Sequence, residues 1–216
     1  MDMTITGIEP YSKGKGREAV YLNDKFAFVL YKGELSQYGL ECGMTVDDKL
    51  YEKIMQETVF PRARKRGMNL LMKMDRTEAD VRGKLSEGGY PPEVVDDAIT
   101  YLKSFHYIDD MRYASEYIRC KSSSMSRKQI GLKLSQKGVD KSIVEEAFTE
   151  FDEESGQDNG SAEKQLIRKL ILKRCPQGVA DLDYNAKQKL YAYLYGKGFS
   201  VPEIETVVIE LMSDDF

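Results

Sequence analysis

The first 44 residues carry the short-period pattern of strands. Apolar and polar residues alternate over residues 3–8, and two further stretches, 18–22 and 25–31, are rich in aromatic and branched side chains. A period of two and this enrichment are typical of strands. Asn23 and Asp24 stand between the latter two stretches as a two-residue hairpin turn. The pattern predicts a small antiparallel β segment over residues 1–44.

From Thr45 the apolar positions recur with the period of a helix. Thr45 and Asp48 have the spacing of a capping box, with Asp in the place of Glu. A helical pattern then continues to Pro61. We therefore predict a connecting helix over residues 45–60.

The rest of the chain contains a repeat. Residues 81–90, 130–139 and 190–199 each hold two apolar residues four apart, a glycine four residues later, and then another apolar residue. Residues four apart share one face of a helix, and a glycine at this distance predicts a left-handed C-cap. The next apolar residue is expected to fold back onto the last turn. One structural unit therefore recurs three times.

Helix starts precede two of the three repeats in the form of capping boxes. Thr77 and Ser126 stand three residues before an acidic or amide side chain, and in the third repeat either Asp183 or Asn185 must cap. Helical runs lie upstream and downstream of each repeat, so each unit is predicted to have three helices.

The predicted fold is mainly α, with three tandem three-helix modules in an elongated curved array after the β segment. Residues 152–160 contain no apolar residue and are predicted to form an acidic flexible linker. The predicted parts are an N-terminal β segment 1–44, a connecting helix 45–60, module 1 at 61–107, module 2 at 108–151, the linker 152–160 and module 3 at 161–216.

Composition removes several classes of function. Three scattered cysteines and a single histidine exclude a disulfide framework and a zinc ribbon. His106 ends a predicted helix and is interpreted as a packing or capping residue. No phosphate loop, nucleophile elbow or zincin motif occurs, so we expect no enzyme activity, cofactor or metal. The longest apolar run has six residues, at 26–31, so we expect a cytoplasmic protein without a membrane contact.

Charge is distributed unevenly along the chain. The whole protein has a net charge of −4, yet residues 112–141 hold eight basic side chains and only two acidic ones. We call these eight cations the basic stripe; a basic cluster at residues 62–66 precedes it. A merely solvated helix face is the alternative interpretation, but such a face usually mixes both signs. The candidate contact residues in modules 2 and 3 are Arg112, Tyr113, Arg119, Lys121, Arg127, Lys128, Lys133, Lys137, Arg168 and Lys169.

Two motifs in the middle module resemble the RecX family of RecA regulators. The first is the run opening module 2, and the second is a signature that ends in a Lys-Gly pair. In this chain they read Tyr107, Ile108, Asp109, Asp110, Arg112, Tyr113 and Ala114, then Arg127, Ile130, Leu134, Lys137 and Gly138. The similarity covers residues 61–213. One departure is the sequence Ser-Ser-Ser-Met at 122–125, where the family usually has a turn glycine.

The resemblance implies a regulator without chemistry of its own. Proteins of the family bind RecA and its filament on single-stranded DNA, limit filament growth, and inhibit strand exchange, ATP hydrolysis and coprotease function. We expect the same partners here, weak direct DNA binding and a monomeric protein. The alternative is a stand-alone helical-repeat protein that binds nucleic acid, which the basic stripe favours and the acidic whole opposes.

Overall fold

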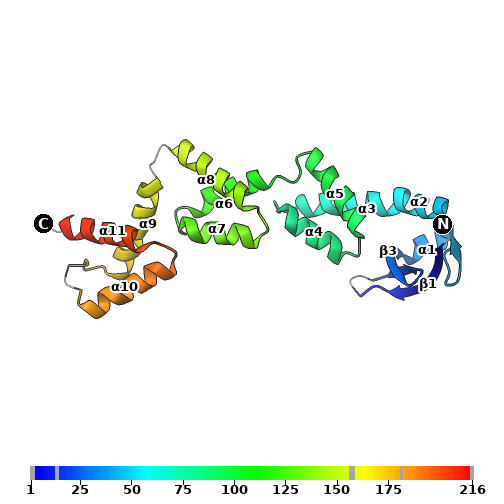
Figure 1. Ribbon diagram of the computed structural model, residues 1–216, viewed down its shortest axis with the longest axis horizontal. Coiled ribbons are helices and arrows are strands. Elements are labelled where there is room, and N and C mark those ends of the chain that lie inside the picture. The colour runs from blue at the N-terminus through cyan, green and yellow to red at the C-terminus, as the bar shows by residue number, and fades with distance from the viewer. Residues whose placement is uncertain (1–2, 13–14, 156–158, 181, 215–216) are drawn as a thin grey trace. The chain divides into compact units, whose positions relative to one another are not determined.

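The computed structural model describes residues 3–12, 15–155, 159–180 and 182–214. The chain divides into two compact units, Met1–Asp109 and Asp110–Phe216. Most of the chain is helical, and a small sheet lies near the N-terminus (Figure 1). Within the described residues, no helix is long and apolar enough to span a membrane.

The first unit opens with a four-stranded antiparallel sheet in the order β3-β2-β1-β4. Its strands are β1 (Met3–Pro10), β2 (Arg17–Leu22), β3 (Lys25–Tyr31) and β4 (Thr45–Val46), and the short helix α1 (Lys32–Tyr38) follows β3. Asn23 and Asp24 have φ values of 48° and 64°. Two left-handed residues are what the tight turn between twisted antiparallel strands requires. The predicted sheet and hairpin are confirmed.

The predicted capping box at Thr45 is wrong. Thr45 and Val46 pair with β1 as strand β4, so the backbone of Thr45 is committed to the sheet. The N-cap is Asp47, whose carboxylate accepts the N–H of Leu50 at 2.7 Å. The helix therefore begins two residues later than the capping-box spacing suggests.

Three helical segments follow one another without a break. They are α2 (Asp48–Ile54), the π-helical turn η1 (Met55–Val59) and α3 (Phe60–Leu71). Pro61 is the second residue of α3, in the first turn after the π-helical segment, where its missing N–H is accommodated. The predicted boundary between the connecting helix and module 1 therefore falls inside a continuous helical run.

The sheet and the first module share one hydrophobic core. The module consists of α3, α4 (Glu78–Glu87) and α5 (Pro92–Ser104). Ile5 and Phe28 of the sheet are fully buried in the same cluster as Leu85 and Ile99 of the helices. Burial of such side chains contributes about 1.5–3 kcal/mol each, so this shared core holds the sheet against the module.

The second unit contains two further three-helix modules. The first is built from α6 (Asp110–Lys121), α7 (Arg127–Gln136) and α8 (Lys141–Ser155), and the second from α9 (Asn159–Arg174), α10 (Tyr184–Gly196) and α11 (Val201–Asp214). Each has its own core. Residues 152–155 of the predicted linker belong to α8 and residues 159–160 to α9, while 156–158 lie outside the described residues.

The three repeat glycines end their helices in the predicted left-handed conformation, each directly after the C-cap residue. Gly89, Gly138 and Gly198 have φ values of 78°, 80° and 91°. In each case the next N–H bonds to the carbonyl five residues back, which also accepts the N–H of the C-cap residue. These pairs are Tyr90 to Leu85, Val139 to Leu134 and Phe199 to Leu194.

The helix starts also follow the predicted caps. Thr77, Ser126 and Asp183 accept the N–H three residues on, which resolves the choice between Asp183 and Asn185. His106 has a φ of 54° after α5, and the next N–H bonds to Leu102. His106 therefore occupies the left-handed capping position that glycine occupies in the repeats.

Candidate functional site

All five lysines of the basic stripe are exposed; Lys137 lies over the ring of Tyr113 and Lys141 pairs with Glu145, which leaves three others. Lys121 ends α6, and Lys128 and Lys133 lie on α7. Within the part of the chain that the structure describes, no carboxylate lies within ion-pair distance of these three ammonium groups. Leu132, which is 60% exposed, follows Lys128 by four residues and shares its helix face. This face combines positive charge with an apolar side chain.

Arg119 is an exposed cation that the fold has already paired. Its guanidinium donates to both carboxylate oxygens of Glu154, at 2.7 and 2.9 Å, and to Glu116 at 3.0 Å. The hydrogen bond to Glu154 is the largest of several effects that raise the pKa of Arg119 above its ordinary value. Since Glu154 lies in α8, the pair links α6 to α8 and removes most of the net charge at this position.

Arg127 joins α7 to α8. Its guanidinium carbon lies 4.2 Å from the ring centre of Phe148, and the group also pairs with Asp152 at 2.9 Å. Its backbone N–H donates to Glu163 of α9 at 2.8 Å. A guanidinium held between an aromatic face and a carboxylate stabilises helix packing, so Arg127 has a structural role.

The aromatic part of the stripe is a pair of stacked tyrosines. The rings of Tyr113 and Tyr117 lie 6.3 Å apart at an angle of 16°, and the ammonium of Lys137 lies 5.8 Å from the centre of Tyr113. Both tyrosines are half-buried against the module core. Arg112 is exposed at the start of α6.

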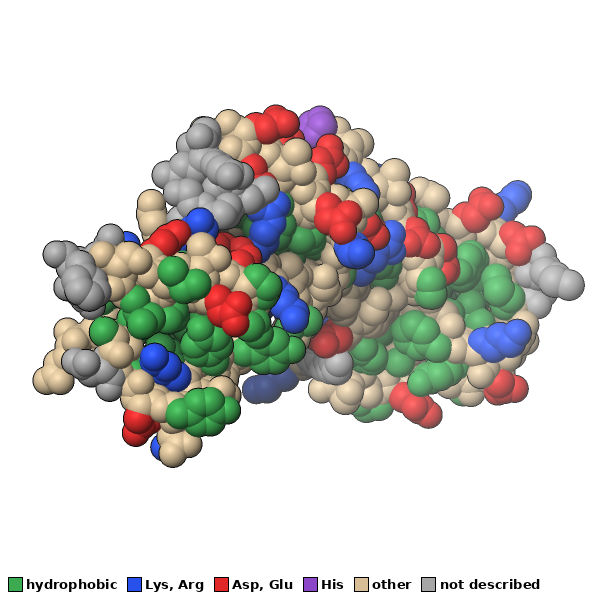
Figure 2. Space-filling model, turned by 60° about the vertical axis from the view of Figure 1, so that its left-hand side comes forward, with side chains coloured by type: hydrophobic (Ala, Val, Ile, Leu, Met, Phe, Trp, Pro, Cys, Tyr) green, Lys and Arg blue, Asp and Glu red, His purple; other side chains and the backbone are tan. Residues whose placement is uncertain are grey.

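In the third module, the candidates lie on α9. Lys169 is exposed, and Arg168 is half-buried. On the face drawn in Figure 2, acidic side chains lie directly beside basic ones. The uniformly positive stripe that the sequence suggested is therefore divided into paired structural cations and exposed lysines.

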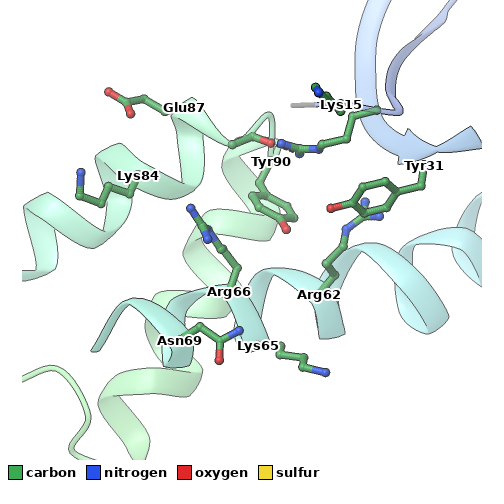
Figure 3. A pocket seen from close by; sticks show the side chains of 11 residues that line it. Lys15, Tyr31, Arg62, Lys65, Arg66, Asn69, Lys84, Glu87 and Tyr90 are labelled. Atoms are coloured by element: carbon green, nitrogen blue, oxygen red, sulfur yellow. Dashed lines mark hydrogen bonds between the residues drawn. The ribbon is translucent and has the colours of Figure 1, made fainter. Parts of the chain in front are cut away.

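A second basic cluster lies in the first unit and forms a pocket of about 580 Å³ (Figure 3). Six cationic side chains line it against one carboxylate, that of Glu87. The cations are Lys15, Arg17, Arg62, Lys65, Arg66 and Lys84. We call it the basic pocket. The sequence indicated only the part at 62–66, because Lys15, Arg17 and Lys84 come from segments that the fold brings together.

Two arginines form the fixed wall of the basic pocket. Arg62 donates to Glu34 at 2.6 Å and to the carbonyl of Val29, and its guanidinium lies 5.4 Å from the ring centre of Tyr31. Arg17 donates to the carbonyl of Gly88. Both residues join the sheet to the helical module, since their partners lie on different elements.

Tyr90 also lines the basic pocket. It is buried, and burial raises the pKa of its hydroxyl above the ordinary value, although Arg62 and Arg17 oppose the rise. The hydroxyl is therefore protonated at neutral pH and is a hydrogen-bond donor.

The candidate residues form surfaces suited to binding. Among the described residues, no group of three or more histidine, cysteine, aspartate or glutamate side chains could hold a metal ion. On α7, the structure places exposed lysines beside an apolar side chain. In the basic pocket, it places clustered cations beside tyrosines. Both combinations suit a macromolecular partner that is anionic, or one that presents anionic and apolar groups together.

The fold and these surfaces define a protein of tandem three-helix modules. Three family descriptions match the modules in order: RecX first three-helix domain at residues 63–102, second at 109–147 and third at 162–208. A crystal structure of a regulatory protein RecX matches with a TM-score of 0.62 and 30% identity, over 98% of this chain and 99% of that one.

The chain belongs to the RecX family. Among curated relatives, the regulatory protein RecX of Clostridium acetobutylicum is 28% identical over 98% of both chains, and that of Clostridium tetani is 29% identical over 98% of this chain and 95% of its own. RecX from Lactobacillus salivarius matches structurally with a TM-score of 0.62 and 26% identity, over 70% of this chain and 96% of that chain. The relatives are named as regulatory proteins, and these names indicate no catalytic activity.

Proposed function

We propose that this protein binds RecA and its filament on single-stranded DNA, and that binding limits filament growth, strand exchange and ATP hydrolysis. The observation that carries the proposal is the outer face of α7, where exposed Lys128 and Lys133 flank the exposed Leu132. Membership of a family of regulatory proteins supports it. The proposed place of action is the cytoplasm, where RecA works.

The chemistry of this face fits a protein partner in a nucleoprotein assembly. An apolar side chain between lysines can enter a hydrophobic depression while the ammonium groups meet carboxylates or phosphates around it. We therefore propose fewer contact residues than the ten candidates that the sequence indicated. Lys121, Lys128, Lys133 and Lys169 are the proposed contacts, whereas Arg119 and Arg127 hold the helices in place.

The test is a titration of RecA ATPase activity on single-stranded DNA with three proteins. The wild type is expected to inhibit, and the double variant Lys128→Glu/Lys133→Glu should need about tenfold more protein for the same inhibition. The matched control is Lys49→Glu/Lys53→Glu, which makes the same charge change at two exposed lysines of α2. Equal inhibition by all three proteins would contradict the proposed contact face.

The alternative is a stand-alone nucleic-acid-binding protein. A pull-down with RecA in the absence of DNA separates the two functions, because only a RecA regulator should retain RecA there. Nanomolar binding to naked DNA near physiological salt, with no RecA retained, would put the alternative first.

A further inference from the structure

The basic pocket concentrates positive charge from four segments of the first unit. Lys15 precedes β2, Arg17 lies on β2, Arg62, Lys65 and Arg66 lie on α3, and Lys84 lies on α4. Figure 3 shows Lys15, Arg62, Arg66 and Lys84 around one hollow, with Tyr31 and Tyr90 between them. Glu34 pairs with Arg62 at 2.6 Å and Asp80 lies 3.9 Å from Lys84, and the positive charge that remains opposes folding unless an anion neutralises it. A concave site with this charge balance therefore suits an anionic ligand.

The wall along α3 has a regular spacing. Arg62, Lys65, Arg66 and Asn69 follow one another at i, i+3, i+4 and i+7, which places all four on one face of the helix. Lys65 and Arg66 are exposed, and no carboxylate of the described residues lies within ion-pair distance of either. Arg62 and Arg17 are already held by protein groups. The pocket therefore combines two arginines held by protein groups with cations that are exposed.

One donor in this wall is unsatisfied. The Nε of Arg62 is buried and has no hydrogen-bond partner among the described residues. Buried donors of this kind are rare in folded proteins, and an ordered water or an ion is one way in which they are satisfied. The observation points to a solvent molecule or an anion as part of the complete site.

We propose that the basic pocket binds phosphates of single-stranded nucleic acid, with one base packed against the exposed part of the Tyr31 ring. The volume of about 580 Å³ has room for a nucleotide but not for a duplex. Tyr31 is 44% exposed, and a sequence-tolerant strand contact uses such a ring together with cations along the backbone.

The ligand is a strand and not a free nucleotide, because positive charge continues beyond the pocket. Lys73 is exposed just after α3 ends, outside the set of lining residues. A mononucleotide in the pocket would leave this lysine without a phosphate. An extended strand could follow α3 from Arg62 toward Lys73.

The experiment measures binding of a fluorescent oligo-dT of about 20 nucleotides to the full chain by anisotropy, in the absence of RecA. If Lys15, Lys65, Arg66 and Lys84 meet phosphates, log affinity should fall against log salt with a slope of about −3, at roughly 0.7 per contact. Lys65→Glu/Arg66→Glu should weaken binding at least about tenfold at low salt and reduce the slope by about 1.4.

The charge-matched control is Lys49→Glu/Lys53→Glu, which changes the same charge in the same unit and should retain binding within about threefold. Tyr31→Ala should weaken binding while leaving the salt slope unchanged, because it removes stacking and no charge. Thermal melts verify that every variant folds.

Several outcomes would overturn the proposal. They are equal losses in Lys65→Glu/Arg66→Glu and in Lys49→Glu/Lys53→Glu, equal affinity for a duplex, or displacement of the oligonucleotide by ATP or polyglutamate at equal charge concentration. Because RecA is absent from this assay, failure here leaves the RecA titration unaffected. Conversely, a protein that binds oligo-dT through the pocket but does not inhibit RecA would contradict only the proposed function.

Discussion

The hydroxyl of Ser126 donates a hydrogen bond to the backbone carbonyl of Lys197, 2.6 Å away, while its oxygen accepts the N–H of Gln129. One side chain thus caps α7 and ties it to the loop after α10. Gly198 lies against the same point, since a Cβ there would stand 2.6 Å from the Ser126 hydroxyl. The C-cap loop of the third module is therefore also one of its contacts with the second.

The equivalent loop of the first module, which follows α4, packs against a different partner. A Cβ at Gly89 would lie 2.5 Å from Val29 and 2.9 Å from Tyr11, both in the N-terminal β segment. Gly138, the equivalent glycine in module 2, is exposed. Identical capping chemistry is thus combined with packing at two of the three glycines.

The two roles predict different costs for the same substitution. Gly138→Ala should lose about 1–2 kcal/mol, because alanine is strained in the left-handed conformation. Gly198→Ala should lose more, since it adds a clash with Ser126 to the same strain. Gly196→Ala, where a Cβ meets nothing within 4 Å, is the control and should be neutral or stabilising. Urea denaturation measures all three, and equal losses at 138 and 198 would contradict the packing role.

A close helix contact in the first unit gives a second prediction. A Cβ at Gly67 of α3 would stand 2.5 Å from the Cδ1 of Leu102 in α5, and both residues are buried. Gly67→Ala should therefore destabilise the unit by about 1–3 kcal/mol through overpacking. Gly83 occupies an exposed position of α4, and Gly83→Ala should instead stabilise the unit by about 0.5–1 kcal/mol. Thermal melts that move in the same direction for both variants would disprove this interpretation.

Arg127 and Lys128 are adjacent in the chain, but their substitution by alanine is predicted to affect stability differently. Arg127→Ala should lower the free energy of unfolding by about 1–2 kcal/mol, because it removes the contact with Phe148 and the pair with Asp152. Lys128→Ala should change stability by less than about 0.5 kcal/mol, as usual for a surface position. Chemical denaturation of both variants checks the assignment. A more stable Arg127→Ala than Lys128→Ala would reverse the roles given above.

Glu163 gives a prediction for pH. Burial raises the pKa of its carboxyl above the ordinary 4.5, and nearby Glu203 adds to the rise, although the N–H of Arg127 opposes it. A carboxyl with a raised folded-state pKa favours folding at low pH, and this contribution is lost as pH rises from about 4.5 through the raised value. Glutamine keeps an acceptor for Arg127 and has no proton to lose.

The stability of Glu163→Gln relative to the wild type should therefore increase as pH rises from about 4 to 7. Thermal melts across this range measure the difference. The exposed Glu146→Gln on α8 is the control and should show little change with pH. A difference that shrinks with rising pH would show that Glu163 stabilises the fold as a charged group.

Local rules made much of the fold predictable. The N-cap residues, the left-handed glycines and the fold-back of the following apolar residue depend only on groups within about five positions, so the repeat in the sequence specified them. The turn at Asn23 and Asp24 is local in the same sense. The predicted helix start at Thr45 was wrong because Thr45 pairs with Thr4 and Val46 with Met3, which are distant in the chain.

The candidate site was only partly predictable. Sequence alone determined that cations gather in residues 112–141 and at 62–66, and that the chain has the modules of the RecX family. Only the tertiary structure decided which cations pair with a carboxylate, because Arg119 and Arg127 meet carboxylates of α8 that are 35 and 25 positions away. It also decided that Lys15, Arg62 and Lys84 line one pocket, since a charge that acts through space can find its neighbour at any separation along the chain.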